Sequence, residues 1–475
     1  MTLVSDLVAV LNEERVRNGG LERALYNRDA SILEGRAGVV CFPETTAEVQ
    51  AVVKVAANHG RAVVPRGAGT GLAGGAVPVG SEGHEPVVVV TTRMNQILEV
   101  DAENAVAWVQ PGVLNLDLSR HVAPLGLHFA PDPSSQQACS IGGNVANNSG
   151  GPHCLAYGVT TAHVLALDVV LADGALVRLG GLEPEGPGYD LRGAFIGSEG
   201  TMGLAVAVAV RLTPLPPALR TLLVGFPTVE AAAETVTAVI GAGIIPAAME
   251  MMDARITKAV EEYVHAGFPA DAAAVLLIEI DGLEDGVTAA AAEVIQLAED
   301  RGATSVRMAA DAAERELLWK GRKSAFGAVA RIAPDYYLHD TVVPRTRLAE
   351  ILARVYELAD ANGVAVMNVF HAGDGNLHPL FLFDRRRPGE LERVKAAGDQ
   401  LIRVCIEAGG VLSGEHGIGL EKRDYMPLLF SPADLLAQDS LRDAFDPTRL
   451  FNPEKVIPSG SRCGDLQSVP PGVWI

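Results

Sequence analysis

The strongest constraint on the fold of this chain is a pair of apolar, strand-like runs that meet at a tight turn. The two runs are residues 364–370 and 379–383. Between them lie Asp374 and Gly375, a dipeptide typical of two-residue hairpin turns. If these two residues form the tip, His371 pairs with His378 and their Cβ atoms lie ~4.5–5.5 Å apart on one face. The sequence therefore predicts a hairpin that presents two imidazoles together.

A second glycine-rich segment, residues 413–419, adds a carboxylate and a further imidazole. For the hairpin alone, two solvated surface histidines are the simpler interpretation. With Glu415 and His416 included, three of the chain's 11 histidines lie in these two segments. This favours a divalent metal held by His371, His378 and Glu415. Imidazole and carboxylate ligands without a thiolate allow zinc, manganese or iron, and the sequence leaves the choice open.

Length and charge narrow the class of protein. A chain of 475 residues is too long for a single core, so we expect two domains or more. The net charge of −20 argues against a nucleic acid or an anionic membrane as partner. The five cysteines form no Cys-x-x-Cys pair, which disfavours iron–sulfur ligation within this chain and fits a reducing compartment. No apolar run approaches the ~20 residues of a membrane helix. We expect a cytoplasmic protein whose association with the inner membrane, if any, is peripheral and through partner subunits.

The first half of the chain contains a glycine-rich loop, residues 66–75, that directly follows a short expected strand, residues 62–65. Its glycines match the dinucleotide fingerprint literally. However, Pro78 follows where the fingerprint needs a helix, and the next strand ends without a ribose-binding acid, so we reject an NAD site. Five glycines in ten residues suit a backbone that approaches a pyrophosphate closely, although a flexible surface turn remains the alternative.

Other elements of the first half follow from capping and turn signals. A capping box at Thr45 and Glu48 predicts a helix that runs to about His59. Hairpins are expected over residues 97–110 and 164–179, and residues 131–151 read as a second long loop of small and polar residues. Prolines at 214, 216 and 217 indicate a domain boundary.

From Leu222 the pattern becomes strand, helix, strand, repeated, which predicts a split β-α-β layer. A helix over residues 314–322 places Arg322 near its carboxyl end. Arginine there is most often a solvated cation that favours the helix terminus. The alternative is a bidentate clamp for a substrate carboxylate.

The paired loops at residues 65–75 and 131–151 resemble the FAD-binding half of the vanillyl-alcohol oxidase and p-cresol methylhydroxylase (PCMH) family. In that family the first loop surrounds the pyrophosphate and the second lies along the flavin and ribityl chain. Thr70 stands where members with covalent flavin often have histidine, so the resemblance implies non-covalent FAD. The residues that it assigns to FAD are Pro65, Arg66, Gly67, Ala68, Gly69, Thr70, Gly71, Pro131, Asp132, Ser134, Ser140, Gly142, Gly143, Asn144, Asn147, Glu199, Gly203 and Asn452.

The second half resembles the C-terminal domain of FAD-linked 2-hydroxy-acid dehydrogenases, most closely the catalytic FAD subunits of bacterial glycolate oxidases. The matching segments are residues 249–253, 319–323, 371–378, 414–419 and 451–455. The resemblance implies an α+β protein: a two-part FAD-binding domain of the PCMH type over residues 1–217, and a ferredoxin-like α+β cap with a helical C-terminal segment that returns to the flavin over residues 218–475.

The reaction implied is oxidation of a small 2-hydroxy acid, glycolate and also D-lactate, with electrons passed to an acceptor other than NAD. His416 is the candidate base, and Arg322 the candidate carboxylate anchor. The resemblance also implies a second flavin subunit and an iron–sulfur subunit as partners. Alternatives are a D-lactate or D-2-hydroxyglutarate dehydrogenase acting alone, an electron-relay flavoprotein without catalysis, and a metal-binding scaffold without flavin.

Overall fold

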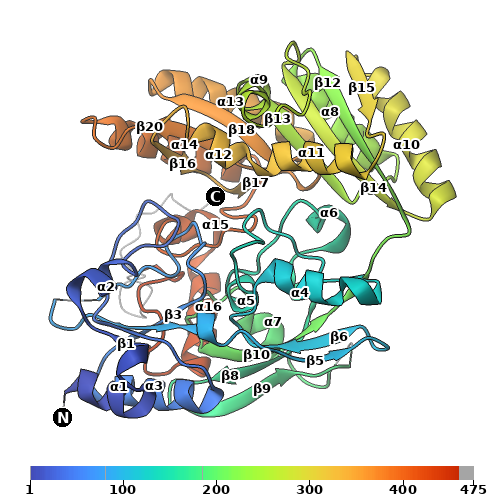
Figure 1. Cartoon of the computed structure of the whole chain (residues 1–475). Helices are drawn as coiled ribbons and strands as arrows, with labels where there is room; N and C mark the ends of the chain where they lie inside the picture. The colour runs from blue at the N-terminus through green and yellow to red at the C-terminus, as the bar shows by residue number, and fades with distance from the viewer. Residues whose placement is uncertain (1, 81, 184–185, 459–475) are drawn as a thin grey trace. The chain divides into compact units, whose positions relative to one another are not determined.

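The structure is a computed structural model that describes residues 2–80, 82–183 and 186–458. Packing of the backbone divides the chain into two compact units (Figure 1). Unit 1 comprises the described residues of Met1–Gly150, Val159–Leu215 and Glu415–Ile475, and unit 2 comprises Gly151–Gly158 and Pro216–Gly414. A short piece of the first half, Gly151–Gly158, packs with unit 2, and the last segment, from Glu415 on, packs with unit 1. The division into domains 1–217 and 218–475 stays a prediction.

Unit 1 contains two larger sheets and a small antiparallel sheet of the two strands β7 and β11. Strands β2, β3 and β4 are parallel and β1 is antiparallel to β2 in a sheet of order β1-β2-β4-β3. The second sheet, of order β5-β6-β10-β8-β9, is antiparallel throughout. The strands are β1 (Val16–Arg17), β2 (Val39–Cys41), β3 (Val63–Arg66), β4 (Val87–Val90), β5 (Ile97–Asp101), β6 (Val106–Val109), β7 (Leu127–His128), β8 (Val164–Val170), β9 (Leu176–Gly180), β10 (Leu204–Arg211) and β11 (Thr213–Pro214).

The core of unit 1 joins the two sheets. Valines of β2, β3 and β4 pack with apolar residues of α1 and α3 and with Val170 and Val206 from the second sheet. The C-terminal segment contributes Phe451, which is fully buried in the same cluster. The helices of unit 1 are α1 (Leu3–Leu11), α2 (Gly20–Ala24), α3 (Thr46–Asn58), α4 (Asn115–Val122), α5 (Ile141–Asn147), α7 (Leu191–Phe195), α15 (Met426–Leu429) and α16 (Pro432–Phe445).

Unit 2 is built on one large sheet of order β15-β12-β14-β13-β18-β19-β17, to which β20 and β16 are added through β18. Helices α8, α10 and α13 form one packed group, and α9, α11 and α12 form another. The strands are β12 (Ala218–Phe226), β13 (Ala248–Asp253), β14 (Ala274–Gly282), β15 (Ser305–Met308), β16 (Asp335–Leu338), β17 (Thr341–Val342), β18 (Ala365–His371), β19 (Asn376–Leu377) and β20 (Pro379–Phe383). The helices are α6 (Cys154–Tyr157), α8 (Val229–Gly241), α9 (Ala254–Val264), α10 (Glu284–Glu299), α11 (Ala312–Lys323), α12 (Ala325–Val329), α13 (Leu348–Ala361) and α14 (Glu390–Glu407).

The expected α+β fold class is confirmed, as are the capped helix α3 and the hairpins β5–β6 and β8–β9. Two expectations need correction. Residues 131–151 are not a continuous loop, because Ser140 caps helix α5 by accepting a hydrogen bond from the Gly143 N–H. The strand β13 was not predicted, because its acidic residues break the apolar pattern of a buried strand.

No helix in residues 2–80, 82–183 and 186–458 is both long enough and apolar enough to span a bilayer.

Candidate active site

The hairpin that carries His371 and His378 forms with a different register from the one predicted. His371, the last residue of β18, pairs with Asn376 and not with His378. The turn is longer than two residues because the 3₁₀ turn η6 (Ala372–Asp374) precedes Gly375, whose φ of 73° is the left-handed conformation that glycine adopts freely. The two histidines are therefore diagonal neighbours on one face of the sheet. Their rings are still close, with centroids 5.0 Å apart and planes at 82°.

A buried glutamate orients the first of these histidines. Glu250 on β13 is the cross-strand partner of His371, and its Oε1 lies 2.7 Å from His371 Nδ1. Its Oε2 lies 2.5 Å from Nη2 of Arg322 on α11. Burial opposes ionisation of Glu250, but the charges of Arg322 and His371 outweigh it and hold the pKa of Glu250 below its usual value. A carboxylate bonded to one ring nitrogen of a histidine is the usual support behind a metal-binding imidazole, and Glu250 has this position relative to His371.

A second buried carboxylate lies beside His378. Asp340 accepts hydrogen bonds from Ser413 Oγ at 2.6 Å and from the Gly414 N–H at 3.0 and 3.1 Å. Its Oδ1 is also 3.5 Å from His378 Nε2. Because Glu415 directly follows Gly414, the bonds made by Asp340 fix the backbone that carries Glu415.

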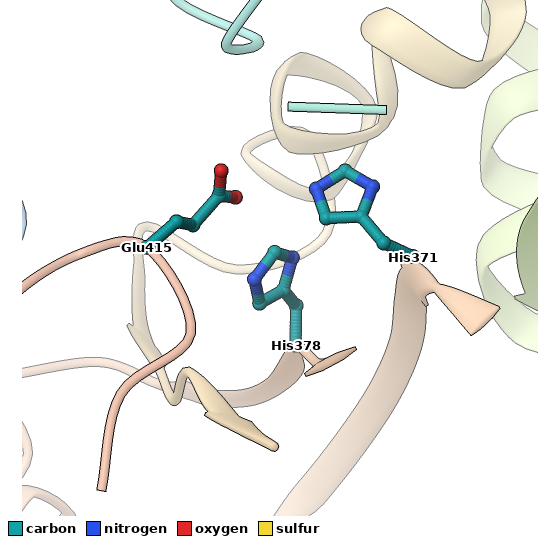
Figure 2. A group of neighbouring side chains, drawn as sticks. All are labelled: His371, His378 and Glu415. Atoms are coloured by element: carbon teal, nitrogen blue, oxygen red, sulfur yellow. The ribbon is translucent and has the colours of Figure 1, made fainter. Parts of the chain in front are cut away.

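His371, His378 and Glu415 bring one potential ligand atom each to within 4.8 Å of one another. Figure 2 shows the two imidazoles and the Glu415 carboxylate facing a common space. Two nitrogens, one carboxylate oxygen and a carboxylate behind the first imidazole are the donor set and support that a divalent zinc, manganese or iron ion requires. The residues present therefore fit a metal of this class.

His416, the candidate base, is held through its backbone by residues of unit 1. Asn147 Nδ2 donates to the His416 carbonyl at 2.8 Å, and the Ile418 N–H donates to Glu199 Oε1 at 2.7 Å. Gly417 between them has a φ of 90°, and a Cβ there would lie 2.7 Å from Glu199 Oε1. The turn that carries His416 thus needs glycine and has two side chains fastened to its backbone.

The two loops assigned to FAD meet within unit 1. The loop after β3 approaches the start of α5 so closely that a Cβ on Gly67 would lie 2.5 Å from Ser140 Oγ. Gly69 and Gly74 have φ values of 74° and 78°, which few other residues adopt. Close glycine backbone from two loops fits the pyrophosphate of a dinucleotide. The residues of unit 1 are therefore compatible with FAD.

The other residues assigned to FAD occupy several elements around these loops. Pro65 and Arg66 end β3, and Pro131, Asp132 and Ser134 precede α5. Asn452 joins three segments, because its Nδ2 donates to the carbonyls of Gly75 at 2.8 Å and Glu199 at 2.6 Å.

Two assigned residues have internal roles that the sequence did not indicate. The Asn144 side chain is 1% exposed and accepts from Asn115 Nδ2 at 3.0 Å. Gly203, with a φ of 140°, lets β10 approach β8, since a Cβ there would lie 2.9 Å from the Val170 carbonyl.

Sequence reasoning assigned no role to Glu250, Asp340 or Ser413. An acid inside an otherwise apolar run, as in residues 247–252, is a signal that could have identified Glu250, because a buried carboxylate must have partners.

Comparison with known proteins extends over both halves of the chain. The family model "FAD binding domain" matches residues 37–180, and "FAD linked oxidases, C-terminal domain" matches residues 215–456. The structure of p-cresol methylhydroxylase with substrate bound has a TM-score of 0.81 at 18% identity and covers 96% of each chain. A 4-ethylphenol oxidase from Gulosibacter chungangensis has a TM-score of 0.79 at 19% identity, again over 96% of each chain. At these identities the likeness shows the PCMH-type fold alone.

The chain belongs to the FAD-linked oxidases, and its cofactor is FAD. Sequence relatives include the glycolate oxidase subunit GlcD of Escherichia coli K12, 46% identical over 90% of this chain and 85% of the relative. GlcD of Bacillus subtilis is 39% identical, and the match covers 96% of this chain and 97% of the relative. A D-lactate dehydrogenase of Anaerostipes hadrus is 33% identical, and the match covers 92% of this chain and 91% of the relative.

Proposed function

We propose that this chain oxidises a small 2-hydroxy acid, glycolate and also D-lactate, to the corresponding 2-oxo acid. The observation that carries the proposal is the convergence of His371, His378 and Glu415 ligand atoms within 4.8 Å in a member of the FAD-linked oxidases. The names of the relatives, glycolate oxidase subunits and a D-lactate dehydrogenase, support the same class of substrate.

The proposed roles follow from what the substrate requires. His371, His378 and Glu415 would hold a divalent cation, which would supply Lewis-acid polarisation of the substrate hydroxyl. A ring nitrogen of His416 accepts the hydroxyl proton, since a neutral imidazole is a competent base near neutral pH. The two glycine-rich loops would hold FAD non-covalently, and FAD would supply the acceptor for the hydride, the hydrogen on Cα with its two electrons.

Arg322 is proposed to bind the substrate carboxylate. Its side chain is 2% exposed, and Nε and Nη1 have no hydrogen-bond partner within residues 2–80, 82–183 and 186–458. Buried guanidinium N–H groups are costly unless they are bonded, so a site that leaves two of them unbonded is suited to an anionic ligand. The ion pair between Nη2 and Glu250 Oε2 keeps the guanidinium in place.

An anaerobic visible spectrum of the purified chain tests the reaction. Glycolate, D-lactate, L-lactate and D-2-hydroxyglutarate are added separately, and bleaching of the flavin band by glycolate or D-lactate is the expected result. The relative rates rank the two substrates, whose difference of one methyl group is worth only ~1–3 kcal/mol in a pocket. A flavin band that none of the four acids bleaches would contradict the proposal and favour a relay subunit.

His378→Ala tests the metal in the same assay. The variant should bind FAD normally and lose turnover, and unchanged turnover would exclude a catalytic metal at this position.

The electron acceptor is proposed to be a separate redox protein or a quinone. The GlcD relatives are named as subunits, which supports assembly with partners, and we propose a second flavin subunit and an iron–sulfur subunit. Such partners would also account for any peripheral association with the inner membrane. Reduction of a dye but not of NAD by the purified chain with glycolate is the expected result, and direct reduction of NAD would contradict it.

A further inference from the structure

The face of helix α11 that packs on the unit 2 sheet carries Arg315, Trp319 and Arg322. These residues are spaced i, i+4 and i+7, so they lie on one side of the helix. Arg315 and Trp319 donate hydrogen bonds to Glu279 of β14, and Arg322 forms an ion pair with Glu250 of β13. Because Glu250 pairs with Leu277 and Glu279 pairs with Ala248, the two glutamates are diagonal neighbours on the same face of the sheet.

Both glutamates also have a histidine partner. Glu279 Oε1 lies 3.3 Å from His153 Nε2, and Glu250 Oε1 lies 2.7 Å from His371 Nδ1. Each constellation therefore consists of a buried glutamate, an arginine of α11 and an imidazole. They differ in the histidine. The group around Glu250 includes His371, a candidate metal ligand, whereas the group around Glu279 includes His153, the N-cap residue of α6, which is not a candidate ligand.

We propose that Glu250 is a positioning residue for the metal and the substrate together. One oxygen fixes the ring and tautomer of His371, and the other fixes the guanidinium of Arg322. The inference rests on the proposed function, in which His371 binds the metal and Arg322 binds the substrate carboxylate. A single rigid carboxylate on β13 then sets the spacing between the metal and the group that anchors the substrate.

The geometry supports this assignment in two ways. The bond from His371 Nδ1 is short and lies between cross-strand partners, so the backbone register itself holds the two side chains together. The Glu250 side chain is fully buried, so water does not compete for either oxygen. Carboxylates in this position raise the basicity of a ligating imidazole, and losing one typically weakens metal binding by ~10–100-fold.

Glu250→Gln in the full-length flavoprotein tests the proposal, with Glu279→Gln as the matched control. The measurement is the apparent Kd for Zn²⁺, titrated alone in a chelator buffer, with flavin absorbance and circular dichroism as checks on folding. We expect Zn²⁺ to bind ~10–100-fold more weakly to the Glu250→Gln variant. The Glu279→Gln variant should keep the parental affinity, because the described partners of Glu279 are His153, Thr221, Arg315 and Trp319, none of which is a candidate ligand. Parental affinity in Glu250→Gln, or equal weakening in both variants, would overturn the proposal.

A double variant keeps the test decisive if Glu250→Gln fails to fold. Removing one member of a buried charge pair leaves the other uncompensated, whereas Glu250→Gln with Arg322→Met removes both charges. The double variant should fold and show the same loss of Zn²⁺ affinity, and parental affinity in it would overturn the proposal as well.

His378→Ala separates the two hypotheses. If this variant loses Zn²⁺ affinity and Glu250→Gln does not, the metal site stands and only the positioning role fails. If His378→Ala binds Zn²⁺ as the parent does, the metal site itself is wrong, and the role of Glu250 fails with it.

Discussion

Glu250 and Glu279 lie on neighbouring strands of one sheet, and the difference between them is in how completely their partners are bonded. Glu279 accepts hydrogen bonds from Thr221, from Trp319 and from both Nε and Nη2 of Arg315, at distances of 2.6 to 2.8 Å. Arg322, the partner of Glu250, is more deeply buried than Arg315, at 2% against 30% exposure. Yet its Nε and Nη1 have no hydrogen-bond partner in the part of the chain that the structure describes.

This difference supports the proposal that the cluster around Glu250 serves the reaction and the cluster around Glu279 serves the fold. The donors around Glu279 are satisfied within the protein, so that cluster fastens α11 and α6 to the sheet. Nε and Nη1 of Arg322, beside Glu250, have no such partner among the described residues, and a fold keeps unsatisfied buried donors only where something compensates for their cost. A bound carboxylate would do so. The exposed fractions of the two glutamate side chains, 0% for Glu250 and 2% for Glu279, do not distinguish them.

The largest expected difference between the two clusters appears when the histidine of each is replaced in turn. His371→Ala should lose the metal and reduce turnover by more than the ~10–100-fold typical of losing a ligand's partner. His153→Ala should retain the metal. Elemental analysis of the purified variants and initial rates with glycolate measure both effects. Loss of the metal from His153→Ala would show that the two clusters are not functionally distinct.

A third buried carboxylate extends the comparison to unit 1. Burial raises the pKa of Glu199 to about 7, against the partial compensation of the Ile418 and Gly419 N–H groups and Lys455. The unfolded pKa is ~4.3, so the folded state holds its proton more tightly, and stability falls as the pH rises from that value towards 7. The pKa shift of Glu279 has the opposite sign, because burial opposes its ionisation but His153 and Arg315 outweigh burial and lower its pKa. The stability that ionised Glu279 contributes is therefore lost as the pH falls below ~4.3.

Glu199→Gln should remove the loss of stability that the parent shows as the pH rises from ~4.3 towards 7. Between pH 5 and 8 the free energy of unfolding of the variant should rise by about 3 kcal/mol relative to that of the parent. Urea unfolding of both flavin-loaded proteins at the two pH values measures it. A constant difference between the two proteins would mean that Glu199 is ionised throughout.

The fold could be predicted from the sequence where local signals dominate. The Thr45 capping box, the β5–β6 hairpin and the strand–helix alternation of unit 2 are set by residues close in sequence. Strand β13 could not be predicted, because Glu250 and Asp253 are tolerated in a buried strand only through partners that are far away in the chain.

The site shows the same limit. The histidines, Glu415 and His416 stand out in the sequence, but the register of the hairpin depends on the 3₁₀ turn before Gly375, which the dipeptide signal does not report. The Glu250–Arg322 pair joins a strand to a helix some 70 residues later. No periodicity in the sequence encodes that contact.

A smaller effect should distinguish the two arginines of α11. Arg322→Lys replaces the planar guanidinium, which can donate two parallel hydrogen bonds, by an ammonium group. It should lower kcat/KM for glycolate roughly 30-fold, which corresponds to about 2 kcal/mol of transition-state stabilisation. Arg315 donates from Nε and Nη2 to the two oxygens of Glu279. Arg315→Lys should therefore leave kcat/KM close to the parental value and lower the free energy of unfolding instead. Steady-state kinetics with unfolding curves check both variants, and equal kinetic losses would place the two arginines in the same role.

The smallest effect concerns the carboxylate behind His378. Ser413→Ala removes one of the bonds to Asp340 but leaves those from the Gly414 N–H. The backbone before Glu415 should therefore stay in place, with a loss of Zn²⁺ affinity of about 1 kcal/mol, or roughly fivefold. Ser440→Ala, which removes a bond within α16 only, is the matched control and should bind Zn²⁺ like the parent. A loss as large as that of Glu250→Gln would mean that Asp340 holds the site through the serine hydroxyl and not through the backbone of Gly414.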